Sequence, residues 1–275
     1  MEIINISAYK FADVPNPLDW RSALKERGDE LGLLGSILLA PEGINCFLAG
    51  ARDSIDAYME FLRHDQLFEG RFTNIEVKES ITDYQPFKRM VVRIKKEIIT
   101  MKHPMIRPAD TRASAVDAKT LKKWLDQGHD DNGREVVLLD TRNQYEVDIG
   151  TFNGARSLNI DFFSEFPQAL QSTAGNTKQD LEDKTIVSFC TGGIRCEKAV
   201  LLMREENFEH VYQLDGGILR YFEEVGGEHW SGECFVFDRR VALDPQLQAT
   251  TTKYEVTAAP LRNSTYLEKV GQENA

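Results

Sequence analysis

Residues 186–199 read Ile-Val-Ser-Phe-Cys-Thr-Gly-Gly-Ile-Arg-Cys-Glu-Lys-Ala, and this stretch decides the fold. An apolar run ends at Cys190, a short loop with two glycines follows, and a helix-like pattern begins near Ile194. The pattern predicts a strand, a tight loop and the N-terminus of a helix, with a thiol at the mouth of the loop.

The loop between Cys190 and Arg195 has the composition of an anion-binding cradle. Its residues are Thr191, Gly192, Gly193 and Ile194. The two glycines lack Cβ, so successive N–H groups can turn inward, and the helix N-terminus and Arg195 add positive charge. A cysteine held there ionises readily, which predicts a reactive thiolate at Cys190. The alternative is an inert cysteine buried before a Gly-Gly turn, and the combined pattern disfavours it.

Apolar strands and helices alternate on both sides of this loop, which indicates a parallel sheet covered on both faces. Strands are expected at 136–139, 186–189 and 211–214, and helices at 117–126, 194–206 and 218–224. Ligands of such sheets lie beyond the carboxyl ends of the strands, where Asp140, Cys190 and Asp215 fall.

Several residues near the loop have two readings. Asp140 and Arg142 border the predicted site, although Asp140 could instead cap the turn after its strand. Arg195 could point at substrate or brace the loop through a carboxylate. Cys196 could act as a resolving thiol, but it shares a helical face with apolar residues, which favours a core position.

The first hundred residues have a different order of elements. Strands are expected at 2–9, 33–39, 44–49 and 75–80, an extended segment at 91–101, and helices at 18–31 and 54–62. The order βαββαβ with a possible extra strand predicts a ferredoxin-like α+β domain.

A basic stretch stands out in a chain of net charge −11. Between Tyr84 and Arg107, seven basic residues face only Glu97, and five of them are Lys88, Arg89, Arg93, Lys95 and Lys96. Such a patch can bind RNA phosphates. The alternative is an exposed strand whose lysines protect a sheet edge from aggregation.

Composition also bounds the cellular context. No run approaches the ~20 apolar residues that span a membrane, and the N-terminus lacks the basic region of a signal peptide. Four scattered cysteines then suggest reduced thiols in a cytoplasmic protein. The five histidines show no metal-ligand spacing, so no metal site is expected.

The loop is Cys-x4-Arg, one residue shorter than the phosphate-binding loop of tyrosine phosphatases, and the shorter ring suits the terminal sulfur of a persulfide. Residues 114–230 resemble the rhodanese domain in this loop and in further motifs. These are Asp140-Thr141-Arg142, Glu146, Gly150, Gly154-Ala155 and Asp215-Gly216-Gly217-Ile218.

Over residues 1–242 the chain also resembles the bacterial rhodanese-domain tRNA uridine hydroxylases. The resemblance rests on residues 40–45 (Ala-Pro-Glu-Gly-Ile-Asn), 189–199 and 232–241. It implies oxygen-dependent formation of 5-hydroxyuridine at the wobble uridine, with Cys190 required and the tRNA anticodon region as partner. One departure is that many members end in a cysteine-containing tail, whereas no cysteine follows Cys234 here.

The resemblance implies an α/β rhodanese-like domain, a parallel sheet flanked by helices, preceded by an α+β ferredoxin-like (acylphosphatase-like) domain. We expect the N-terminal domain at 1–102, a proline-containing linker at 103–113, the rhodanese domain at 114–231, and a C-terminal extension with a flexible tail at 232–275. No membrane partner is expected, and the oligomeric state stays open between a monomer and a weak dimer.

The expected chemistry centres on Cys190 as thiolate, persulfide or oxidised species, supported by loop N–H groups and Arg195. We hypothesise that the thiolate adds to C6 of uridine and activates C5 toward an oxidant. No flavin, nicotinamide or iron motif is visible, so no cofactor is evident beyond molecular oxygen as co-substrate. One alternative is a persulfide-forming sulfurtransferase. Another is a non-catalytic binding module, and the intact cysteine loop disfavours only this second alternative.

Overall fold

The structure is a computed structural model that describes residues 2–181 and 183–250. The chain divides into two compact units, Met1–Thr100 and Met101–Ala275, each described by itself below. Within the described residues, no helix has the length and apolar character needed to cross a bilayer. The tail expected over the last two dozen residues lies outside the described part of the chain.

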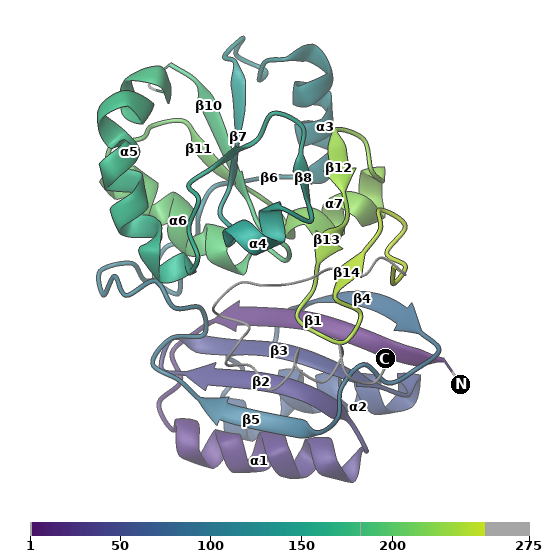
Figure 1. Ribbon diagram of the computed structural model, residues 1–275. Coiled ribbons are helices and arrows are strands. Elements are labelled where there is room, and N and C mark those ends of the chain that lie inside the picture. Colours follow the sequence, from purple (N-terminus) through teal and green to yellow (C-terminus); the bar gives the residue numbers. More distant parts are fainter. Residues whose placement is uncertain (1, 182, 251–275) are drawn as a thin grey trace. The chain divides into compact units, whose positions relative to one another are not determined.

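The first unit is one five-stranded sheet with two helices on the same face (Figure 1). Its elements are β1 (Ile3–Phe11), α1 (Pro17–Glu30), β2 (Leu34–Ala40), β3 (Gly43–Gly50), α2 (Arg52–His64), η1 (Gln66–Phe68), β4 (Glu76–Thr82) and β5 (Met90–Ile94). The strand order is β4-β1-β3-β2-β5. Apolar side chains of the sheet and both helices, among them Trp20 and Tyr58, form its core. The predicted ferredoxin-like order is confirmed.

The hairpin formed by β2 and β3 depends on Gly43. Its φ is +148°, and a Cβ there would lie 2.1 Å from the carbonyl oxygen of Lys10. Glycine is therefore required where β3 begins beside β1.

The extended segment predicted at 91–101 is shorter than expected. β5 ends at Ile94 because its parallel partner β2 ends at Ala40 and offers no further backbone groups beyond the bond from Lys95 N–H to Leu39 O. β5 is an edge strand of the sheet.

The second unit is an α/β layer structure. Its elements are β6 (Ala115–Val116), α3 (Ala118–Gln127), β7 (Val136–Asp140), α4 (Gln144–Val147), β8 (Gly150–Phe152), β9 (Arg156–Ser157), η2 (Phe163–Glu165), α5 (Phe166–Leu181), β10 (Thr185–Phe189), α6 (Ile194–Glu205), β11 (Val211–Leu214), α7 (Gly217–Val225), β12 (Trp230–Gly232), β13 (Cys234–Phe235) and β14 (Ala242–Leu243). The main sheet has the order β6-β11-β10-β7-β9, with every pair parallel. Helices α5 and α6 lie on one face, and α3 and α7 on the other (Figure 1). The predicted α/β class is confirmed.

The strand register brings the predicted site together. β10 is central and pairs Phe189 with Asp140 of β7, so Cys190 and Asp140 meet at the carboxyl edge of the sheet. The Thr141 N–H donates to Phe189 O over 3.0 Å, which continues this pairing past the end of β7.

Two parts of the second unit differ from the expectation. Helix α5 was not predicted. The segment 232–241 was expected to be extended throughout, but β12 ends at Gly232, where φ is +84° and a Cβ would lie 2.4 Å from Ile149 O. The chain turns there into the short strand β13, which pairs with β14 instead of continuing β12.

Candidate active site

Cys190 follows the last residue of β10 and is fully buried. The Gly193 N–H donates to Cys190 Sγ over 3.2 Å, and Gly193 has φ +98°, which favours glycine. On the other side, Gly217 approaches so closely that a Cβ would lie 2.4 Å from Cys190 O and 2.7 Å from Gly193 N. The loop is therefore curled around the sulfur and locked against the start of α7.

The environment of Cys190 favours the thiolate. Burial alone would raise the pKa of this thiol, but hydrogen bonds from Cys196 and from the backbone N–H groups of Arg195 and Gly193, together with the charge of Arg195, lower the pKa to about 5. At neutral pH the sulfur is then an anion surrounded by donors, which is the activated form of a cysteine nucleophile.

Cys196 lies in the core and also touches the site. It is fully buried in α6, and its thiol is 3.5 Å from Thr141 Oγ1. Burial and the neighbouring Cys190 raise the pKa of Cys196 well above its usual value, so it remains a neutral donor beside the thiolate. The core position favoured for Cys196 is thus confirmed, while its alternative role as a resolving thiol stays a hypothesis.

Arg195 is held by Glu146 of α4. Its Nη1 lies 2.5 Å from Glu146 Oε2 and its Nη2 2.8 Å from Oε1, in a bidentate pair that is almost completely buried. The contact braces the loop, which is one of the two roles considered for Arg195. Glu146 belongs to a recognisable sequence motif, but its partner 49 positions away was not predicted.

Asp140 and Arg142 form a second buried ion pair below the loop. Arg142 Nη2 is 2.6 Å from Asp140 Oδ2, and both side chains have no exposed surface. Thr151 Oγ1 donates to the same Asp140 oxygen over 2.8 Å, and Arg142 also donates to Gly150 O over 2.6 Å. These contacts fix the turn after β7 and the start of β8, so both residues stabilise the backbone at this edge of the sheet.

The remaining predicted residues are Asp215 and the basic residues of the first unit. Asp215 sits at the expected edge but is paired with Arg220, whose Nη1 is 2.6 Å from its Oδ2. The five basic residues predicted to bind RNA are all exposed, on or beside edge strand β5; they are Lys88, Arg89, Arg93, Lys95 and Lys96. Their exposure suits both RNA binding and protection of the edge.

The other two cysteines are buried thiols. Burial raises the pKa of Cys46 far above its usual value and that of Cys234 to about 12. Both therefore stay protonated and unreactive at neutral pH.

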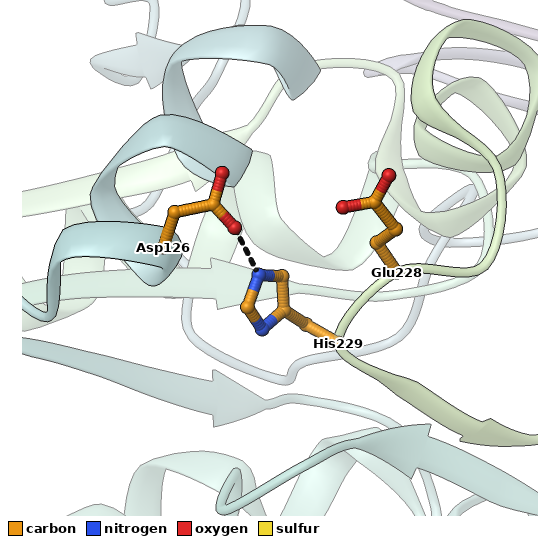
Figure 2. A group of neighbouring side chains, drawn as sticks. All are labelled: Asp126, Glu228 and His229. Atoms are coloured by element: carbon orange, nitrogen blue, oxygen red, sulfur yellow. Dashed lines mark hydrogen bonds and ion pairs between the residues drawn. The ribbon is translucent and has the colours of Figure 1, made fainter.

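A group of possible metal ligands lies away from Cys190. Atoms of Asp126, Glu228 and His229 lie within 4.8 Å of one another, and His229 contacts Asp126 (Figure 2). The Lys122 ammonium lies 2.7 Å from both carboxylates and already pairs with each of them, so we assign no metal there. No sequence pattern predicts this group, because His229 and Asp126 are 103 positions apart.

The curled cysteine loop at the edge of a parallel sheet defines the class of the second unit. Residues 117–224 match the rhodanese-like domain family, and residues 3–98 match the UPF0176 acylphosphatase-like domain. The chain thus joins an acylphosphatase-like domain to a rhodanese-like domain.

Relatives that match most of this chain identify the family. A protein of Burkholderia vietnamiensis named tRNA uridine(34) hydroxylase is 59% identical over 250 residues, which cover 91% of this chain and 87% of the relative. One of Paraburkholderia phytofirmans with the same name is 58% identical over 252 residues, 92% of this chain and 86% of the relative. The chain belongs to the tRNA uridine(34) hydroxylase family. Among solved structures, the human single-domain sulfurtransferase TSTD1 is 26% identical over 41% of this chain and 97% of its own, with a TM-score of 0.33.

Proposed function

We propose that the chain hydroxylates uridine 34 of tRNA at C5 to give 5-hydroxyuridine, with molecular oxygen as co-substrate and Cys190 as the nucleophile. The family supports the substrate and the reaction type. The observation that carries the chemistry is the buried Cys190 sulfur, which accepts the Gly193 N–H over 3.2 Å and whose pKa is lowered by the charge and hydrogen bonds of its neighbours. A tRNA substrate makes the protein a cytoplasmic enzyme in this proposal.

The proposed chemistry begins with addition of the Cys190 thiolate to C6 of uracil. The C6–S bond forms, and the C5=C6 π electrons move to an enolate at C5 and O4. The enolate carbon attacks a peroxide-level oxidant, which forms from molecular oxygen and a two-electron reductant. The C5–O bond forms as the O–O bond breaks, and the second oxygen atom leaves as water. Loss of the C5 proton and expulsion of the thiolate then restore the double bond. The loop N–H groups support the charge on sulfur before the addition and after the expulsion.

The deciding experiment is mass spectrometry of tRNA nucleosides from a strain lacking this gene, complemented with the wild-type chain or with Cys190→Ser. We expect 5-hydroxyuridine and its derivatives to return only with the wild-type chain. Full recovery with Cys190→Ser would exclude cysteine chemistry. Loss of 2-thio groups in place of hydroxyl groups would assign the chain to persulfide sulfur transfer.

The exposed basic residues along β5 are the proposed contact with tRNA phosphates. Replacing Lys95 by Glu should weaken tRNA binding and reduce the slope of log K against log salt by about 0.9 to 2, because each lost phosphate contact removes roughly 0.9 and the new charge adds repulsion. Lys119→Glu, which changes another exposed lysine, on α3, is the control. Equal slopes for the two variants would leave the β5 residues as protection of a sheet edge.

A further inference from the structure

Glu146 links Arg195 to the backbone of Asn143, next to the Cys190 loop. Glu146 binds Arg195 through both carboxylate oxygens and accepts the Asn143 N–H over 3.2 Å. Asn143 Nδ2 in turn lies 3.2 Å from the hydroxyl of Tyr145. Arg195 and Asn143 are thereby anchored to one carboxylate.

Three aromatic rings close this set into a circle. The Tyr145 ring packs edge-on against Phe235, with centroids 5.3 Å apart, and Phe235 packs edge-on against Phe237 at 5.1 Å. The guanidinium of Arg195 lies over the Phe237 ring, 6.0 Å from its centroid. Thr191 Oγ1 of the cysteine loop donates to Phe235 O over 3.4 Å, which ties this circle to the reactive loop.

Two polar atoms in the circle are buried without a hydrogen-bond partner among the described residues. They are Nε of Arg195, a donor, and Oδ1 of Asn143, an acceptor. Arg195 as a whole is only 4% exposed. Buried polar atoms are nearly always paired, because an unmet hydrogen bond costs free energy, so an unpaired donor and acceptor beside a reactive site indicate a ligand that pairs with both.

The required ligand presents an acceptor next to a donor. The edge of uracil has this pattern, with the O4 acceptor beside the N3–H donor. Cytosine has the reverse pattern, an N4 donor beside the N3 acceptor. A base read this way sits beside the loop that carries Cys190.

We propose that this circle of side chains is a uracil-reading subsite. Arg195 Nε–H donates to O4, Asn143 Oδ1 accepts from N3–H, and Phe237 is the stacking face. The inference rests on the proposed function for its substrate, a single-stranded uridine, and adds the residues that select it.

Phe237 is the member of the circle that is free to meet a base. Its side chain is 43% exposed, whereas Phe235 beneath it is 3% exposed and Cys190 is fully buried. A base reaches Arg195 when the Phe237 ring moves from its place over the guanidinium, and the ring then stacks on the base. Single-stranded RNA is commonly bound in this way, because every base offers a face to an aromatic ring.

The test measures binding of two anticodon stem-loops, with uridine or cytidine at position 34, to the full-length chain. Phe237→Ala should weaken binding of the uridine stem-loop on the order of 10-fold to 100-fold, and Phe237→Tyr should retain it. Phe162→Ala is the matched control, because Phe162 is 45% exposed in another segment of the same unit. Asn143→Ala should reduce the preference for uridine over cytidine on the order of 10-fold.

The ratio of uridine to cytidine binding separates base reading from a structural role, since a damaged fold weakens both complexes alike. Equal losses for Phe237→Ala and Phe162→Ala, or an unchanged ratio in Asn143→Ala, would overturn the subsite. Selective binding by a wild-type chain that does not hydroxylate would instead overturn the proposed function and leave the subsite intact. If the wild-type chain hydroxylates uridine 34 but the variants bind both stem-loops as the wild type does, the subsite would be overturned and the proposed function would stand.

Discussion

Replacing Glu146 by Gln tests whether the buried ion pair holds the cysteine loop in place. The substitution keeps the size of the side chain but removes the charge opposite Arg195, whose side chain is 5% exposed while that of Glu146 has no exposed surface. Breaking a buried pair from one side leaves an uncompensated charge, which costs about 3–5 kcal/mol. A glutamine oxygen still accepts one hydrogen bond from the guanidinium, so we expect a loss near the lower end, about 3 kcal/mol.

Amide hydrogen exchange on the full-length chain measures this loss where it arises, as the free energy of opening of β10 and α6. The matched control is Glu135→Gln, which breaks the ion pair with Lys184, 2.9 Å away, at a site where the Glu135 side chain is 62% exposed. Exposed pairs contribute roughly 0–1 kcal/mol, so the control should change little. A loss in Glu146→Gln no larger than that in Glu135→Gln would refute the claim that this pair braces the loop.

Two further predictions concern the loop itself. The thiolate absorbance that Cys190→Ser removes should persist through neutral pH and disappear as the pH falls through about 5, because the pKa of Cys190 is lowered there; a midpoint near the ordinary thiol value would contradict this reading. Gly217→Ala should destabilise the second unit by clearly more than Gly128→Ala, measured by urea unfolding, and should also lower the thiolate signal. Both glycines have positive φ, so an alanine is strained by about 1–2 kcal/mol at either position. Only at Gly217 would the new Cβ meet backbone, at 2.4 Å, whereas at Gly128 no atom lies within 4 Å. Equal losses of stability in the two variants would show that the close approach of α7 is unimportant.

Local patterns were enough to predict the strand, the tight loop and the helix start around Cys190. The strand, the two glycines and the helix start occupy consecutive positions, so their geometry follows from short-range sterics. Parallel strands place their carboxyl ends at one edge, and this rule alone brought Asp140 beside Cys190. Both domain folds followed from the order of elements in the same way.

Long-range pairing was out of reach of the same reasoning. Whether Arg195 braces the loop or faces substrate depends on where Glu146 lies, and the two are 49 positions apart with no pattern linking them. The prediction of an extended segment throughout residues 232–241 was wrong for a related reason. Gly232 takes a left-handed conformation because the backbone of Ile149 lies against it, which is a tertiary contact.

The two buried ion pairs suggest which parts of the site are rigid and which can move. Asp140 and Glu146 stand at the two ends of one short turn after β7, and each binds an arginine that is at most 5% exposed at its side chain. Charges held this firmly keep the loop N–H groups aimed at the sulfur before any substrate arrives, which is what electrostatic preorganisation requires. Motion that admits a base must therefore come from the side facing the ion pairs. Phe237 can provide this motion. Its side chain is exposed, and in the described part of the chain its ring touches Arg195 only by lying against the guanidinium.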